Sequence, residues 1–159
     1  MVEIPYSLSM YKAYDTLSDG LKSTLSNLRA RHSSVHVFGA ARAEKGNDDT
    51  VGRIKNPEAA TQEAIHPVVI SHPETGRKSL YVNPGFTLGF EGWSDEESKP
   101  LLEYLYAHAA RPEFTCRFQW KEGSIAFWDN RATWHLAVND YQGSRRMMHR
   151  ITIEGTPLF

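Results

Sequence analysis

Apolar residues in the first part of the chain repeat with the spacing of an amphipathic helix. Four leucines fall on one face over residues 8–31: Leu17, Leu21, Leu25 and Leu28. This spacing predicts a helix, and Ser18 and Gly20 are positions at which it can divide into two. The segment 35–38 is a candidate for a short strand, and the polar residues 39–53 predict a loop.

A second helix is predicted to open at Ser94, because three acidic residues follow it in a capping-box pattern. Its apolar positions are Leu101, Leu102, Leu105 and Tyr106. Pro100 lacks a backbone donor, so the helix is either kinked there or begins nearer Ser98. The pair Arg111-Pro112 predicts the end of the helix.

Most of the remaining apolar runs are typical of strands. Residues 68–71 and 79–82 are β-prone and flank the turn sequence 73–76, which predicts a hairpin. Alternation of apolar and polar residues over 114–121 predicts a half-buried strand. Cys116 lies on its apolar face, so we expect a buried cysteine rather than a nucleophile.

Two further strands are predicted near the C-terminus, over 125–128 and 146–154, on either side of a loop. Helices therefore come first and strands last. This order indicates an α+β fold that is mainly antiparallel β, with helices on one side of the sheet. A length of 159 residues is that of a single domain.

Composition narrows the class of protein. Eighteen basic residues face 19 acidic ones, so the net charge of −1 gives no support for nucleic acid or a membrane as the main partner. The single cysteine excludes an internal disulfide framework and fits a reducing compartment. Because neither a signal peptide nor an apolar run of about 18 residues occurs, we expect a cytoplasmic protein.

Residues 128–155 concentrate side chains that bind metals and anions: His135, Arg145, Arg146, His149 and Arg150. Residues two apart on a strand share a face, so Arg146 and Arg150 lie on one face and His149 on the other. Their Cα atoms would lie about 13 Å apart, so the two guanidinium groups on one face could hold two different anions. Alternatively, each arginine pairs with a carboxylate such as Asp129, Asp140 or Glu154.

The histidines also leave two interpretations open. His135 falls in a predicted turn, where an imidazole can either bind a metal or serve as a hydrogen-bonded structural residue. His72-Pro73-Glu74 has the spacing of the His-x-carboxylate half of a facial triad. It also lies in the predicted hairpin turn, where proline and glutamate are ordinary residues.

Six segments together resemble one enzyme family. They are 66–69, 76–86, 111–114, 128–135 (WDNRATWH), 139–141 (NDY) and 145–152 (RRMMHRIT). These motifs are similar to the C-terminal signature of the taurine dioxygenase and TfdA family of Fe(II)- and 2-oxoglutarate-dependent oxygenases. The resemblance covers nearly everything from about residue 8 onward.

The resemblance implies a role for four residues. His135 would bind iron, Arg146 would hold the distal carboxylate of 2-oxoglutarate, and Arg150 would face the acidic group of the primary substrate. Phe86 would line the substrate pocket. The implied reaction uses O2 to hydroxylate a small organic acid, such as a sulfonate, a sulfate ester or a phenoxy acid, within a double-stranded β-helix, or jelly roll.

One half of the family's iron site has no counterpart in this sequence. The family carries it as His-x-Asp, and none of the seven histidines here is followed two positions later by Asp. The resemblance therefore predicts that residues 1–159 are one N-terminally truncated domain with a partial jelly roll.

Two functions remain open on this basis. The chain is an oxygenase completed by a second chain or by His72 and Glu74, or it is a non-catalytic remnant that binds an organic anion or serves as an oligomer subunit. Because unpaired strand edges template association, we also expect a homo-oligomer or self-association.

Overall fold

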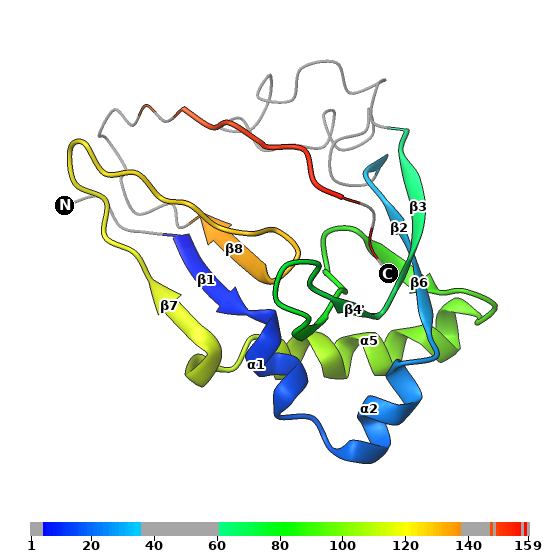
Figure 1. The fold of residues 1–159 in the computed structure, drawn as a ribbon. Coiled ribbons are helices and arrows are strands. Elements are labelled where there is room, and N and C mark those ends of the chain that lie inside the picture. Colours follow the sequence, from blue (N-terminus) through cyan, green and yellow to red (C-terminus); the bar gives the residue numbers. More distant parts are fainter. Residues whose placement is uncertain (1–4, 36–60, 138–146, 148, 157, 159) are drawn as a thin grey trace.

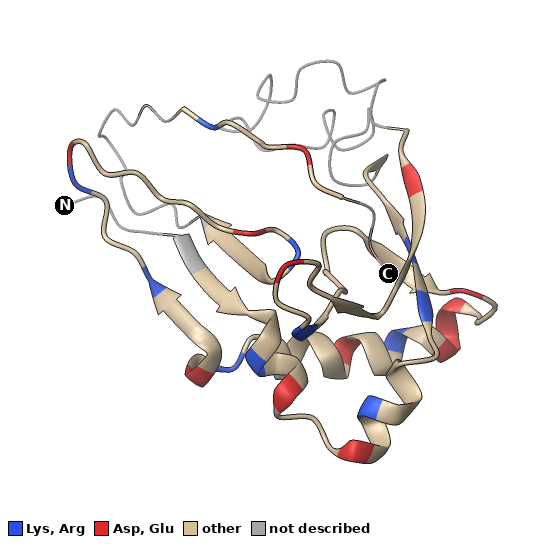
Figure 2. Cartoon of the chain, viewed as in Figure 1, with Lys and Arg blue, Asp and Glu red and all other residues tan. Residues whose placement is uncertain are grey.

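In a computed structural model the chain is described over residues 5–35, 61–137, 147, 149–156 and 158 (Figure 1). Within these residues, small antiparallel sheets pack against helices, which agrees with the predicted α+β class. No helix in the part of the chain that is described is long and apolar enough to cross a membrane. Figure 2 shows that acidic and basic residues are mixed over the described ribbon.

The first sheet joins the start of the chain to its C-terminal half. Strand β1 (Pro5–Ser9) lies between β7 (Thr115–Arg117) and β8 (Thr133–Ala137), and both pairings are antiparallel. Figure 1 shows β1 between its two partners. The sequence patterns predicted neither β1 nor β8 as a strand.

The second sheet corrects the prediction of a helix up to residue 31. Strand β2 (Arg29–Ser33) lies between β3 (Glu63–Pro67) and β6 (Thr87–Phe90), with an irregularity in the register with β6 between Arg31 and His32. Pairing with two strands that are distant in sequence overrides the leucine spacing, and it places Ala30 and Phe90 in the core with no exposed surface. Most of the strand candidate 35–38 and all of the loop 39–53 lie outside the described residues.

The predicted hairpin is confirmed. Strands β4 (Val69–Ser71) and β5 (Lys78–Leu80) pair antiparallel, with Ile70 opposite Ser79. The turn closes with hydrogen bonds from the His72 amide to the Arg77 carbonyl at 2.9 Å and from the Gly76 amide to the His72 carbonyl at 2.8 Å. Gly76 has a φ of 67°, a conformation that glycine adopts without steric cost.

The first predicted helix divides as expected, at Ser18. Helix α1 (Met10–Asp15) ends before that serine, whose side chain then caps α2 (Asp19–Leu25) by accepting a hydrogen bond from the Leu21 amide. Of the four leucines, Leu17 and Leu25 are buried, and Leu21 and Leu28 are partly buried against the core. The leucine face was therefore predicted correctly, although the helical span was too long.

Helix α5 (Asp95–Ala109) begins at the predicted capping box. Ser94 accepts from the Glu97 amide, and the Glu97 side chain accepts in return from the Ser94 amide. The helix starts at Asp95, not nearer Ser98, and it continues through Pro100. A short 3-10 turn, η2 (Pro112–Phe114), follows its end.

The core lies where α1 and α5 cover the hairpin and the second sheet. Its buried members are Met10, Ala13, Tyr14, Leu17, Leu25, Ala30, Val68, Leu80, Val82, Phe90, Leu102, Leu105, Ala109 and Phe114. Nearly all of them precede residue 110, so the C-terminal third contributes little to the described core.

The strand predictions for the C-terminal third are largely wrong. The strand predicted over 114–121 shortens to β7, and neither 125–128 nor the described residues of 146–154 form a strand. Several apolar residues of these segments are exposed, among them Ile125 at 89%, Phe127 at 87% and Ile151 at 90%. Cys116 is also exposed, contrary to the expectation of burial, because it lies on an outer strand.

Candidate functional site

His135 lies in strand β8, not in a turn as the sequence suggested. It pairs with Ser7 of β1, and the Trp128 ring lies 5.0 Å from its ring centre. Partial burial, and secondly the charge of Arg150, lower the pKa of His135. The imidazole is therefore neutral near pH 7, which is the form that binds a metal ion.

Of the predicted site residues that the structure describes, Arg150 has an electrostatic effect on His135. Its side chain is exposed, yet its charge is close enough to lower the pKa of the histidine. Arg146 lies outside the described residues, so its place on the same face as Arg150 stays a prediction from the sequence.

Asp129 binds two partners just before strand β8. Its Oδ2 atom lies 2.7 Å from an Arg131 guanidinium nitrogen and 2.8 Å from His72 Nε2, and its Oδ1 accepts from Arg131 Nε at 2.9 Å. Hydrogen bonds from Arg131, followed by the one from His72, hold the pKa of Asp129 well below its usual range. The Asp129 carboxylate thus pairs with Arg131 and His72, which the sequence analysis did not consider.

His72 has no free nitrogen to offer a metal. While Nε2 binds Asp129, Nδ1 accepts a hydrogen bond from the Glu74 amide at 3.3 Å. The proposed His-x-carboxylate pair is therefore a structural contact in which His72, 8% exposed, links the hairpin turn to the segment that leads into β8.

Further hydrogen bonds hold the segment between Asp129 and His135 in place. The Ser79 hydroxyl donates to the Arg131 carbonyl at 3.1 Å, and the Met10 amide donates to the Ala132 carbonyl at 2.9 Å. Trp134 Nε1 donates to the Val82 carbonyl at 2.9 Å. The position of His135 therefore depends on the hairpin and α1 as well as on its own strand.

Phe86 lies in the tight turn that opens β6. Its amide donates to the Asn83 carbonyl at 3.1 Å, and its carbonyl accepts from the Ser33 amide at 2.8 Å. The side chain is partly buried. The backbone at Phe86 is thus fixed by the second sheet, whereas His135 belongs to the first.

A ferrous facial triad needs two histidines and one carboxylate. In residues 5–35, 61–137 and the described positions beyond them, no group of three His, Cys, Asp or Glu side chains could hold a metal. His135 suits the role of one imidazole ligand, but the described residues do not supply the other two. They fit part of the iron site and not all of it.

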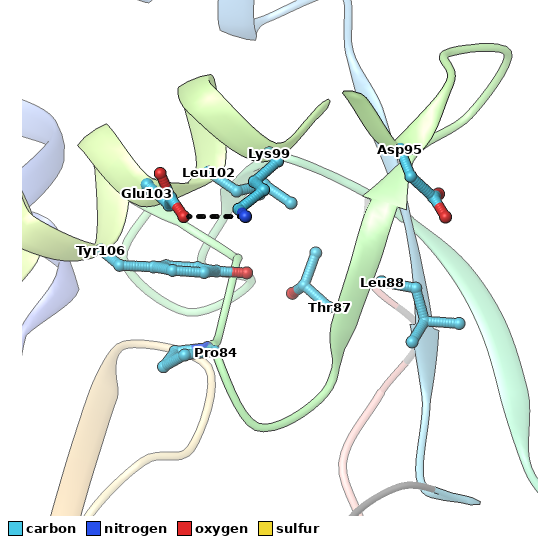
Figure 3. Close-up of a pocket in the computed structure, with 8 residues that line it drawn as sticks. All are labelled: Pro84, Thr87, Leu88, Asp95, Lys99, Leu102, Glu103 and Tyr106. Carbon is cyan, nitrogen blue, oxygen red and sulfur yellow. Dashed lines mark ion pairs between the residues drawn. The ribbon is translucent and has the colours of Figure 1, made fainter. Parts of the chain in front are cut away.

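A pocket of about 320 Å³ lies between α5 and β6 (Figure 3). Thr87 and Tyr106 line it, and Lys99 and Glu103 form an ion pair at 3.9 Å on its wall. None of the predicted site residues lines this pocket. It is therefore a separate feature from the surroundings of His135.

Two groups of residues were missed by sequence reasoning. The Asp129–Arg131 pair could have been suspected from its spacing of two within the WDNR motif. The second group, His32, His66 and Tyr81, has ring centres 5.5 Å apart for each pair. No local pattern signals it, because its members come from three distant segments.

Comparison with known proteins adds an independent line of evidence. The model of the family described as "Taurine catabolism dioxygenase TauD, TfdA family" matches residues 7–152. The chain therefore belongs to the TauD/TfdA family, as its C-terminal motifs indicated.

Similar proteins place the chain within this family. An alkylsulfatase of Acinetobacter baylyi is 40% identical over 144 residues, which are 90% of this chain and 45% of that protein. An alpha-ketoglutarate-dependent sulfate ester dioxygenase of Pseudomonas putida is 33% identical, over 90% of this chain and 47% of its own length. The chain thus spans less than half the length of these curated relatives.

Solved structures agree on the fold. The crystal structure of a taurine dioxygenase from Burkholderia xenovorans has a TM-score of 0.69 at 38% identity, covering 88% of this chain and 43% of that one. The structure of AAD-2 in complex with Mn(II) and N-oxalylglycine has a TM-score of 0.64 at 28% identity. It covers 84% of this chain and 49% of the other.

Proposed function

We propose that this chain is the C-terminal part of an Fe(II)- and 2-oxoglutarate-dependent dioxygenase domain with a partial double-stranded β-helix. The reaction is hydroxylation of a small organic acid, such as a sulfonate, a sulfate ester or a phenoxy acid, with O2. The observation that carries the proposal is the match of residues 7–152 to the family model, and the lowered pKa of His135, caused by burial and then by Arg150, agrees with it. Membership of the family and the similarity to a sulfate ester dioxygenase support the substrate class.

Each site residue has a chemical task in this proposal. His135 presents a neutral imidazole to iron, and Arg146 binds the distal carboxylate of 2-oxoglutarate through two parallel hydrogen bonds. Arg150 attracts the acidic group of the primary substrate, and Phe86 covers its apolar part. Iron, when bound, supplies the activation of O2.

The rest of the iron site must come from outside this sequence, because none of its histidines has Asp two positions later. The exposed apolar residues Phe127, Leu136 and Ile151 support the same view, since a folded oxygenase domain would cover them. We therefore expect a polypeptide that carries His-x-Asp to complete both the sheet and the metal site.

Complementation tests this proposal. The chain is mixed with the N-terminal half of the Acinetobacter baylyi alkylsulfatase, and binding of Fe(II) and 2-oxoglutarate is followed under argon by the visible charge-transfer band. We expect the band, and succinate formation once O2 is admitted, only when both polypeptides are present. His135→Ala and Arg146→Ala should abolish both signals.

Arg145→Ala is the matched control, because in the strand that we expect to form in the completed domain Arg145 would lie on the opposite face from Arg146. Loss of the signal in this variant to the same degree as in Arg146→Ala would contradict the assigned roles. A band formed by the alkylsulfatase half alone would contradict a role for His135.

A second function is favoured because the described residues contain no group of three side chains that could hold a metal: a non-catalytic binder of organic anions, or an oligomer subunit. Calorimetry with 2-oxoglutarate in the absence of metal separates the two functions. A binder retains affinity that Arg146→Ala removes, whereas an incomplete oxygenase gains affinity only with iron and the complementing half.

A further inference from the structure

We propose that His32 and His66 form a site for one borderline divalent metal ion, Zn²⁺ or Cu²⁺, separate from the site of His135. The two histidines lie on neighbouring strands, with His66 opposite Ala30 and His32 opposite Ala64. They are therefore diagonal neighbours on one face of the sheet, and their ring centres are 5.5 Å apart. The Tyr81 ring lies 5.5 Å from each of them.

His32 presents one ring nitrogen that has no partner. Its Nε2 atom is buried and makes no hydrogen bond with the described residues. Buried polar atoms are nearly always bonded, so an unsatisfied one in a native structure points to a water molecule or an ion. A ligand shared with the neighbouring His66 would satisfy it.

The other ring nitrogen of His32 has a partner within the fold. Nδ1 lies 3.3 Å from the Thr87 hydroxyl oxygen, which also accepts from the Asn83 amide at 2.8 Å. Thr87 thus holds Nδ1, and Nε2 is the nitrogen left to face a ligand.

A metal-binding histidine has the same arrangement, with one nitrogen hydrogen-bonded to an outer partner and the other facing the ion. Burial, and secondly the neighbouring His66, lower the pKa of His32 to about 4. Burial and then Arg29 also lower the pKa of His66. Arg29, whose charge acts on His66, is itself paired with Glu91 at 3.4 Å. Both imidazoles are therefore neutral at pH 7 and able to bind a metal.

The ring separation agrees with a shared ion. With metal–nitrogen distances of about 2.1 Å, each ring centre lies roughly 3.2 Å from the ion. Two centres 5.5 Å apart then subtend an angle of roughly 120° at the metal, close to tetrahedral. Two imidazoles without a carboxylate favour Zn²⁺ or Cu²⁺ over Mg²⁺ or Ca²⁺.

Calorimetric titration with Zn²⁺ tests the site in a His135→Ala background, so that metal at the proposed iron site does not contribute. We expect one ion per chain. His66→Ala changes a half-exposed residue and should weaken binding at least tenfold, as should His32→Phe, which keeps the volume of the ring. His149→Ala is the matched control, because it removes an exposed histidine that belongs to neither strand of the pair, and it should leave the affinity unchanged.

Electron paramagnetic resonance with Cu²⁺ gives a second readout that does not depend on affinity. The spectrum should show coupling to two imidazole nitrogens, reduced to one in His66→Ala. Absence of stoichiometric Zn²⁺ binding in the His135→Ala chain would overturn the proposal. So would affinity that survives both substitutions, or a nitrogen coupling that His149→Ala removes. None of these outcomes bears on the oxygenase proposal, which rests on His135 and Arg146.

Discussion

Replacing Asp129 by Asn should destabilise the fold by about 2 kcal/mol. The substitution keeps the shape of the side chain but removes the charge that binds Arg131 and His72 at 2.7 and 2.8 Å. Breaking a fully buried ion pair costs about 3–5 kcal/mol, whereas exposed pairs are worth about 0–1 kcal/mol. The side chains of Asp129 and Arg131 are 33% and 25% exposed, which places the cost between these limits.

Chemical denaturation followed by circular dichroism measures this cost. Asp15→Asn is the matched control, because Asp15 forms an ion pair with Arg77 at 3.1 Å in which both side chains are more than half exposed. We expect that variant to lose less than about 0.5 kcal/mol. Equal losses in the two variants would refute the view that partial burial strengthens the Asp129 contacts.

The pH dependence provides a second check. The pKa of Asp129 is lower in the folded chain than in the unfolded one, so its stabilisation is fully present above the unfolded value of about 3.9. It is lost as the pH falls below that value towards the folded pKa. The difference between the wild-type chain and Asp129→Asn should therefore be constant from pH 7 to 5 and shrink below pH 4. If the stability difference shrank between pH 7 and 5 instead, a titrating group other than Asp129 would be responsible for it.

Three further predictions concern other parts of the chain. Because burial lowers the pKa of His32 to about 4, stability should fall by about 2–3 kcal/mol as the pH drops from 6.5 to 4, and His32→Phe should remove that slope in denaturation curves. Ser94→Ala removes the hydroxyl that accepts from the Glu97 amide and should cost about 1 kcal/mol, while Ser26→Ala, outside any such box, serves as a control in thermal unfolding. Light scattering should show self-association that Phe127→Lys and Ile151→Lys reduce; a monodisperse wild-type monomer would contradict the assignment of these exposed residues to a missing interface.

Elements formed by residues close together in the sequence were predicted well. The capping box at Ser94 and the hairpin around Gly76 each depend on residues within a few positions, so a local pattern contains the necessary information. Strand β2 was predicted as helix because its pairing with β3 and β6 involves partners far along the chain. Local leucine spacing cannot report such pairing.

The errors at the C-terminus have a related cause. Residues 125–128 and 149–154 have strand-like composition, but a strand forms only when a neighbour satisfies its backbone donors and acceptors. For the candidate site, the roles of His135, Arg146 and Arg150 stay predictions from the sequence motifs, and the charge of Arg150 contributes to the lowered pKa of His135. The Asp129 contact with His72 could not be predicted, because it joins residues 57 positions apart.

Strand β1 has a consequence for handling this protein. It is the strand through which β7 and β8 are hydrogen-bonded in the described sheet, so residues 5–9 hold together two segments from the C-terminal half of the chain. A protease cut just before Met10, or a tag that draws these residues away, would release both outer strands at once and loosen His135 without touching it. The integrity of the N-terminus therefore deserves to be verified by mass spectrometry before any loss of metal binding is attributed to a substitution.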